Sequence, residues 1–231
     1  MANKLYFDIE TIPASEEWAE KLRYLYERYF KKQKGKGKEE EDIITYEDFL
    51  NETGFDGAFG RIVCIGYAEN DKKPEVLSGD ERTQLEKFWI LASRADIFVG
   101  HNIRDFDLPF ILQRSTILGV KPTWQLYEEP GVPKYKVNRF LDLARYRSCP
   151  VFDTQWEWSR WVDKYKNKTL EHIAISMGIP TPKVGIDGSE VYKFYKEGKI
   201  KEICDYCMRD VDTTRQVYKR ITFEGLGSAP F

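Results

Sequence analysis

The stretch Lys4-Leu5-Tyr6-Phe7-Asp8-Ile9-Glu10-Thr11, near the start of the 231-residue sequence, decides the fold. Its apolar run predicts a buried strand. Successive side chains of a strand point to opposite faces, so Asp8 and Glu10 share a face and converge near the strand's end. Two neighbouring carboxylates repel each other, and hard divalent cations such as Mg²⁺ and Mn²⁺ bind carboxylate oxygens. The pair therefore predicts a metal site, with a solvated rim as the alternative if the rest of the chain supplies no further acids.

The composition excludes several classes of protein. The 36 basic and 38 acidic residues leave a net charge of −2, which argues against a tight, sequence-independent duplex binder because such binding depends on many phosphate contacts. The length suits one well-filled domain or a domain with a sizeable insertion. No apolar run is long enough to span a membrane. The four unevenly spaced cysteines and the absence of a signal-like segment lead us to expect a cytoplasmic protein.

Cys204 and Cys207 form a C-x-x-C motif inside a helical pattern. A second cysteine pair, which a zinc site would need, is missing, and a redox pair usually lies at a helix start after a strand. We expect this motif to be structural.

Residues 14–58 are predicted to be an insertion between two strands. A capped, acidic helix start at Ser15-Glu16-Glu17-Trp18 precedes apolar residues at helical spacing. The block 31–42, a lysine-rich run followed by an acidic run, is interpreted as a solvated loop. The alternative is a basic flap that contacts nucleic-acid phosphates.

The remaining pattern predicts an α/β protein, with a mixed five-stranded sheet flanked by helices. Strands are expected at 61–68, 75–78, 96–100 and 150–154, with 139–143 as an alternative for the last strand. Helices are expected after the cap Asp80, from Phe106 with Pro109 in the first turn, and over 170–178, 191–195 and 200–221. Trp156, Trp158 and Trp161 are expected to pack under a loop, although a base-stacking platform is the alternative.

Three separated acidic segments can meet in this fold. If the strand ending at Gly100 lies parallel to the first strand, its following loop brings Asp107 to the edge that carries Asp8 and Glu10. A C-terminal helix crossing that edge adds Asp210, with Tyr206 one turn away.

Such a cluster suits two-metal phosphodiester hydrolysis, in which two cations about 4 Å apart neutralise the phosphate and acidify the attacking water. Asp8 would bridge both ions. Neither His101 nor His172 is spaced to act as a base beside Asp210, so Tyr206 remains to orient the water.

These segments resemble a known superfamily. Phe7–Thr11, His101–Asp107 and Tyr206–Val211 look like the three exonuclease motifs of the DEDD (DnaQ-like) superfamily, in its tyrosine-containing branch. The second half is similar to stand-alone proteins that resemble the proofreading domain of family B DNA polymerases, through 152–154, 170–180 and 188–191. The resemblance covers nearly the whole chain except residues 14–58 and about 120–148.

The resemblance implies a ribonuclease H-like fold and removal of nucleotides from a 3′ end with two Mg²⁺ or Mn²⁺ ions. By position, it assigns Asp8, Glu10 and Asp210 to the first metal, and Asp8 and Asp107 to the second, partly through water. Tyr206 would orient the nucleophile. Thr11 and Ile12 would contact the terminal nucleotide, and Asn102 would help shape the site.

We therefore expect residues 1–231 to form a single 3′–5′ exonuclease domain acting on single-stranded DNA. An RNA 3′-end exonuclease of the same fold is the first alternative, because both use the same metal chemistry. A non-catalytic nucleic-acid-binding module is the second, and its hallmark would be the loss of an acid, whereas all four are present.

Overall fold

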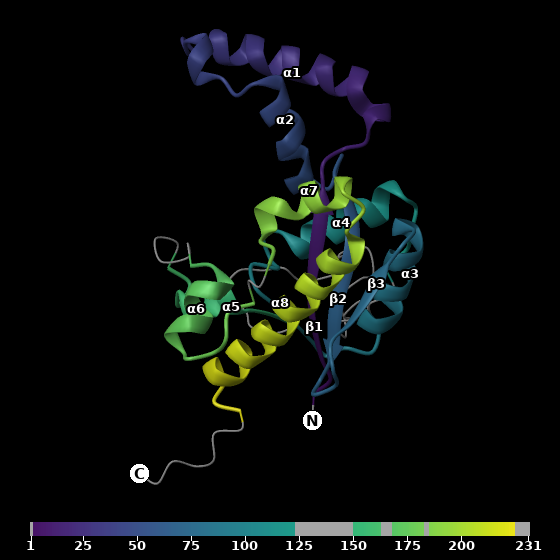
Figure 1. Ribbon diagram of the computed structural model, residues 1–231, viewed down its shortest axis with the longest axis vertical. Coiled ribbons are helices and arrows are strands. Elements are labelled where there is room, and N and C mark those ends of the chain that lie inside the picture. Colours follow the sequence, from purple (N-terminus) through teal and green to yellow (C-terminus); the bar gives the residue numbers. More distant parts are fainter. Residues whose placement is uncertain (1, 123–149, 163–167, 183–184, 225–231) are drawn as a thin grey trace, which may run out of the picture.

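A five-stranded mixed sheet forms the centre of the computed structural model, which describes residues 2–122, 150–162, 168–182 and 185–224 (Figure 1). The strand order is β3-β2-β1-β4-β5. The strands are β1 (Lys4–Ile12), β2 (Arg61–Glu69), β3 (Glu75–Ser78), β4 (Ile97–Gly100) and β5 (Val151–Asp153). β1 pairs antiparallel with β2 and parallel with β4, which confirms the predicted α/β fold and the parallel neighbour of the first strand.

The central strand β1 separates two apolar layers. Leu5, Phe7 and Ile9 point into a core shared with helices α3 (Glu81–Ala92) and α4 (Asp107–Ile117). The alternate residues face helix α8 (Ile200–Ile221), where Tyr6 packs with Val211 and Tyr218, and Ile12 with Tyr206 and Cys207. The face of β1 that carries Asp8 and Glu10 is thus the face that α8 covers.

The structure describes five other helices. They are α1 (Ala19–Lys34), α2 (Tyr46–Glu52), α5 (Thr154–Trp158), α6 (Leu170–Ser176) and α7 (Val191–Lys196), with short 3₁₀ turns at Glu16–Trp18, Glu40–Asp42, Thr53–Phe55 and Gly188–Glu190. Asp80 caps α3 as predicted, since its carboxylate accepts a hydrogen bond from the Thr83 backbone N–H at 2.8 Å. Pro109 lies in the first turn of α4, where its missing N–H is tolerated. Among the described residues, no helix is both long and apolar enough to cross a membrane.

Residues 14–58 connect β1 to β2 and form a helical arm. Helices α1 and α2 project beyond the end of the sheet at which β1 finishes (Figure 1). The two helices pack through aromatic rings, with Tyr26 5.3 Å from Tyr46 and 5.5 Å from Phe49 between ring centroids. At the base of the arm, the Thr11 hydroxyl donates to the Gly54 carbonyl at 2.7 Å, so the arm is attached directly after the acidic end of β1.

Two details of the arm differ from the sequence prediction. The predicted loop 31–42 is wrong over its first part, because α1 continues through Lys34. Cationic side chains in a last turn interact favourably with the helix dipole, and the aromatic contacts with α2 hold the helix together. Ser15 does not cap α1: its hydroxyl donates to Glu17 at 2.8 Å, and the α-helix begins only at Ala19, after a 3₁₀ turn.

The tryptophans divide into two groups. Trp156 is buried and stacks on Trp161 with 5.4 Å between ring centroids, which confirms the packing interpretation for this pair. Trp158 instead lies at the surface, with 38% of its area exposed. The strand predicted at 150–154 is confirmed as β5, and the alternative at 139–143 lies outside the described residues.

Candidate active site

The acidic end of β1 forms the centre of the candidate site. Asp8 and Glu10 alternate with Ile9, so both carboxylates point toward α8, where the Cys207 thiol meets them. One ligand atom from each of Asp8, Glu10 and Cys207 lies within 4.8 Å of the others. A bulge between Glu10 and Thr11 then shifts the pairing with β2. Strand geometry thus holds the two acids side by side.

Asp107 joins this edge from the neighbouring strand. It is the first residue of α4, and its side chain is almost fully buried. Its Oδ1 accepts a hydrogen bond from the Ile9 backbone N–H at 3.0 Å, between the two acids of β1. Because β1 and β4 are parallel, the loop after β4 delivers Asp107 to this edge, as the sequence predicted.

The loop that carries Asp107 is held by Asp153 at the end of β5. The Asp153 carboxylate accepts hydrogen bonds from the backbone N–H groups of Asn102, at 3.0 Å, and Arg104, at 3.1 Å. Asn102 adopts a positive φ of 61°, a conformation that asparagine tolerates better than most residues. The Asn102 backbone is thus fixed in this loop, and Asp153 positions the loop.

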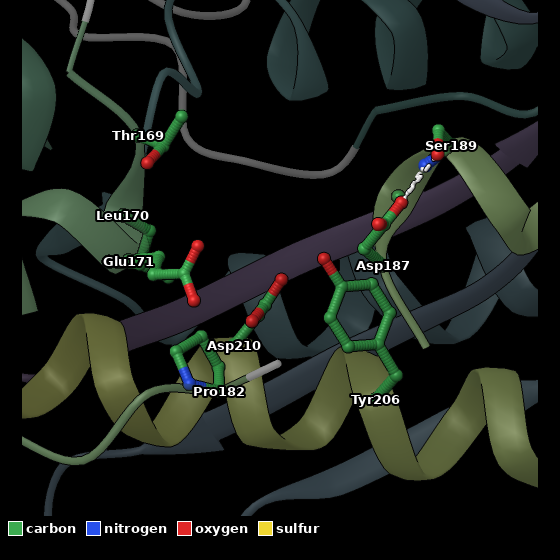
Figure 2. A pocket seen from close by; sticks show the side chains of 9 residues that line it. Thr169, Leu170, Glu171, Pro182, Asp187, Ser189, Tyr206 and Asp210 are labelled. Carbon is green, nitrogen blue, oxygen red and sulfur yellow. Dashed lines mark hydrogen bonds between the residues drawn. The ribbon is translucent and has the colours of Figure 1, made fainter. Parts of the chain in front are cut away.

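Helix α8 supplies Tyr206 and Asp210 one turn apart. Figure 2 shows their side chains rising from the same side of the helix, between Glu171 and Asp187. Both line a cavity of about 480 Å³. Its other lining residues are Thr169, Leu170, Glu171, Pro182, Asp187, Gly188 and Ser189. This volume lies within the range of small-ligand sites.

Electrostatic interactions link the four acids across β1, α4 and α8. Burial raises the pKa of Asp8 well above its usual range, and Cys207, Asp107, Glu10 and Asp210 raise it further. Burial likewise has the largest effect on the pKa of Glu10, which it raises, and Cys207, Asp210 and Asp107 raise it further. Burial raises the pKa of Asp107 to about 8, and Asp210 contributes in the same direction. Asp210 thus acts on all three other acids, as the sequence predicted for a shared cluster.

The donor set fits a hard divalent cation. Buried carboxylates are costly unless a counter-charge compensates them, and the chief influences on the pKa of Asp8 and Glu10 are burial, acids and thiols. Carboxylate oxygens are the ligands that Mg²⁺ and Mn²⁺ prefer, whereas the thiol of Cys207 suits softer metals. A cation bound here would therefore offset the repulsion between these carboxylates.

Cys207 is the residue that the sequence reasoning missed. Its Sγ lies 3.5 Å from Asp8 Oδ2 and accepts a hydrogen bond from the Gly66 N–H at 3.2 Å. Ile203, Cys207 and Val211 recur every four residues on the buried face of α8. That period places Cys207 toward the sheet and could have predicted its position beside the acids.

The side chains of Thr11 and Ile12 make contacts within the fold. The Thr11 hydroxyl donates to Gly54, and Ile12 is 2% exposed in the layer beneath α7 and α8. Their contact with a terminal nucleotide stays a prediction. Because the Ile12 side chain is buried, such a contact would have to come from its backbone.

His101 has a structural environment. Its ring nitrogens lie 3.0 Å from Thr154 Oγ1 and 3.1 Å from the Lys168 carbonyl oxygen. Burial lowers the pKa of His101 to about 4, so its imidazole stays neutral. The second histidine, His172, is exposed on α6.

The mixed sheet with flanking helices is consistent with the ribonuclease H-like exonuclease fold, and four acids gather at one edge of its central strand. The chain belongs to the family described as "Predicted 3'-5' exonuclease related to the exonuclease domain of PolB", whose model matches residues 56–225.

Two proteins that are similar to this chain are consistent with its membership of this family. The chain is 23% identical over 167 residues to a DNA polymerase of Archaeoglobus fulgidus, covering 69% of this chain and 20% of that polymerase. The family B DNA polymerase of the archaeon Pyrobaculum calidifontis has a similar fold, with a TM-score of 0.56 and 17% identity. That match covers 96% of this chain and 25% of the polymerase, so the chain spans about a fifth to a quarter of these relatives.

Proposed function

We propose that this protein is a metal-dependent 3′–5′ exonuclease that hydrolyses phosphodiester bonds at the 3′ end of single-stranded DNA. In this proposal residues 1–231 form one exonuclease domain, with 14–58 inserted between its first two strands. The observation that carries the proposal is the arrangement of acids around the end of β1. Asp8 and Glu10 lie side by side, Asp107 accepts a hydrogen bond from Ile9 between them, and Asp210 on α8 interacts electrostatically with all three. The family adds support, because its members are described as predicted 3′–5′ exonucleases.

The proposal gives each acid a role. Asp8, Glu10 and Asp210 would hold one Mg²⁺ or Mn²⁺ ion, and Asp8 and Asp107 would hold a second. When bound, such a pair neutralises the phosphate, lowers the pKa of the attacking water and stabilises the leaving oxygen. The Ile9 N–H fixes the orientation of Asp107, and the strand alternation of β1 fixes that of Asp8 and Glu10.

Tyr206 would orient the attacking water. Burial raises the pKa of the Tyr206 phenol, and Asp210, Glu10 and Asp8 raise it further. The hydroxyl therefore keeps its proton at neutral pH, which suits a hydrogen-bonding role rather than that of a base. Tyr206 and Asp210 face the same cavity, where a terminal nucleotide would bind.

Replacement of one acid tests the proposal. We expect Asp8→Ala and Asp210→Ala each to lower the digestion of a 5′-labelled single-stranded DNA at least about 10³-fold, because metal ions contribute several kcal/mol to the transition state. Asp205→Ala, on the exposed side of α8, is the matched control and should keep full activity. Full activity of the Asp8→Ala variant would show that the proposed site is not the active site.

The choice of DNA needs its own measurement. DNA is favoured because both relatives are DNA polymerases. Oligomers of the same sequence in DNA and RNA, digested side by side with Mg²⁺ and with Mn²⁺, would separate the two substrates. Faster loss of the RNA would assign the protein to the alternative, an RNA 3′-end exonuclease.

A further inference from the structure

The helical arm, residues 14–58, is divided into a basic half and an acidic half. Residues 19–38 carry two acids, Glu20 and Glu27, and eight cations: Lys21, Arg23, Arg28, Lys31, Lys32, Lys34, Lys36 and Lys38. Residues 39–56 carry no cation and eight acids: Glu39, Glu40, Glu41, Asp42, Glu47, Asp48, Glu52 and Asp56. The match to the family model begins at residue 56, so all of these charged residues except Asp56 lie before it. The family match therefore does not account for this division of charge.

The basic half presents its charges to solvent. All eight cationic residues are exposed, and over the described residues the arm holds one ion pair, Lys34 to Glu40 at 3.7 Å. The helix dipole accounts for cations in the last turn, which includes Lys34. Near the N-terminus, where the dipole disfavours cations, Lys21 and Arg23 instead lie over the rings of Trp18 and Tyr46, at 4.6 Å and 4.1 Å from the ring centroids. Arg28, Lys36 and Lys38 lie outside that last turn and form no ion pair among the described residues, so the dipole does not explain them.

Exposed aromatic rings accompany these charges. Tyr24 is 58% exposed on α1, with the Arg28 guanidinium 5.8 Å from its ring centroid. At the base of the arm Phe55 is 75% exposed, and its ring lies 6.3 Å from that of Phe106, the residue before Asp107. Cations interleaved with exposed rings are the combination that binds single-stranded nucleic acid, because phosphates meet the charges and bases stack on the rings.

We propose that the basic face of α1 binds the phosphates of a nucleic-acid strand whose 3′ end lies in the candidate active site. This inference rests in part on the proposed exonuclease function. The arm leaves the sheet next to that site, since Thr11 follows Glu10 and its hydroxyl holds Gly54. Helix α1 has 16 residues and is about 24 Å long, which is enough to contact several nucleotides.

The acidic half has a consequence for this binding. Its carboxylates repel phosphates, so they restrict the strand to the α1 side of the arm. The same division of charge would also suit a second copy of the chain, with basic and acidic halves exchanged. The exposed rings among the cations and the attachment beside Glu10 favour the strand, and self-association becomes an outcome of the test.

The test removes three outward charges from α1. Gln keeps helix propensity, so we choose the triple variant Arg28→Gln, Lys31→Gln and Lys32→Gln. The matched control is Lys72→Gln, Lys73→Gln and Lys87→Gln, which makes the same change in net charge on exposed residues of the β2–β3 turn and of α3. Fluorescence anisotropy in EDTA, where the strand is not digested, gives the Kd of a 20-nucleotide and a 4-nucleotide single-stranded DNA at several salt concentrations.

We expect the arm variant to bind the 20-mer about tenfold more weakly and the 4-mer as wild type does. The slope of log Kd against log salt for the 20-mer should fall by about 2, since each phosphate contact to a single strand contributes about 0.7. The control triple variant should keep the wild-type slope. Equal slopes in wild type and arm variant would overturn the proposal, as would an arm variant that changes only the oligomeric state in sedimentation.

Two further measurements separate this inference from the proposed function. Hydrolysis of the p-nitrophenyl ester of thymidine 5′-monophosphate, which is too small to reach the arm, should be unchanged in the arm variant. If wild type does not hydrolyse this ester or digest DNA but the arm variant still binds the 20-mer more weakly, the exonuclease proposal fails and the arm proposal stands. If circular dichroism shows that the triple variant is unfolded, the single variants Arg28→Gln and Lys32→Gln on α1 replace it, each with the same expected direction and a smaller effect.

Discussion

Asp8 occupies the most crowded position of the candidate site. It lies two residues from Glu10 on one strand, and the Cys207 thiol approaches its carboxylate to 3.5 Å. Burial and these neighbours all disfavour its charged form. Each buried acid here is therefore less stable as an anion than it would be in water. An arrangement of this kind lowers the stability of the metal-free fold and favours the binding of a cation.

This repulsion predicts that Asp8→Asn stabilises the metal-free protein. The amide keeps the size of the side chain and removes an acid that the folded chain can hold only as a disfavoured anion or by taking up a proton, so we expect about 1 kcal/mol of gain, or about 2–4 °C in Tm for a chain of this size. Thermal unfolding in EDTA at pH 8 measures it. With Mn²⁺ the order should reverse, because wild type gains more from the ion. A lower Tm for Asp8→Asn than for wild type in EDTA would contradict this account.

Tyr206→Phe isolates the phenol hydroxyl. Loss of one water-positioning hydrogen bond should reduce kcat about 10- to 100-fold, with little change in KM for a DNA oligomer. Because the phenol is protonated throughout the working range, the pH profile of kcat should keep its shape. Single-turnover digestion between pH 6 and pH 9 measures both. A fully active Tyr206→Phe variant would show that the hydroxyl is dispensable.

At the scale of elements, the site depends on how closely α8 approaches the sheet. Gly66 of β2 faces Cys207, and a Cβ at this position would lie 2.8 Å from the Cys207 Sγ and 3.1 Å from a methyl group of Val211. Glycine is therefore needed for close packing rather than for an unusual φ. The same approach brings Tyr206 and Asp210 over the acids of β1.

Gly66→Ala should push α8 away from the sheet. We expect a loss of about 1–3 kcal/mol in the free energy of unfolding, as for other overpacked sites, together with a reduced kcat. Urea unfolding and digestion of labelled DNA measure the two effects. Gly35→Ala is the control, since Gly35 ends α1 with a helical φ of −64° and should tolerate alanine without loss. Wild-type stability in Gly66→Ala would mean that the contact between β2 and α8 is not tight.

The elements near the site were the most predictable from the sequence. The alternation around Asp8 and Glu10, the cap at Asp80 and the long C-terminal helix each follow from local rules that the core reinforces. The end of α1 was not predictable, because its lysine-rich turn has the composition of a loop and depends on aromatic packing against α2. The C-x-x-C spacing of Cys204 and Cys207 is typical of metal or redox chemistry, whereas the position of Cys207 beside Asp8 follows from the four-residue period of the buried face of α8.

At the scale of the whole molecule, the sequence predicted which segments meet but not how the arm is placed. Asp107 follows β4, and the parallel pairing of β4 with β1 leaves one edge at which it can arrive. The arm has no such constraint, because its helices pack mainly on each other. Its direction depends on a few contacts at its base, such as the bond from Thr11 to Gly54 and the Trp18–Phe59 ring contact at 5.6 Å.

The acid cluster should also set how stability depends on pH. Asp8, Glu10 and Asp107 have raised pKa values in the folded state, and that of Asp107 is about 8 against an ordinary value of 3.8. Above about pH 4 the unfolded chain loses these protons while the folded protein retains them, so the stability of the metal-free protein should fall as the pH rises toward 8. His101 acts in the opposite sense, but only between about pH 4 and 6.5, because its folded pKa is about 4.

Between pH 6.5 and 8 His101 no longer contributes. Cys204, whose pKa the hydrogen bond with Cys64 lowers to about 7, acts there in the opposite sense to the acids, so a comparison with Asp107→Asn is needed to isolate the carboxylate. In EDTA, we expect the Tm of wild type to decrease across this window and that of Asp107→Asn to decrease less, since the amide does not titrate while its oxygen can still accept from Ile9. The increase in Tm on adding Mn²⁺ should grow with pH, because the ion replaces protons on its ligands. Parallel curves for wild type and Asp107→Asn would show that Asp107 is already ionised in the folded protein. A cation would then not have to displace a proton from Asp107 when it binds.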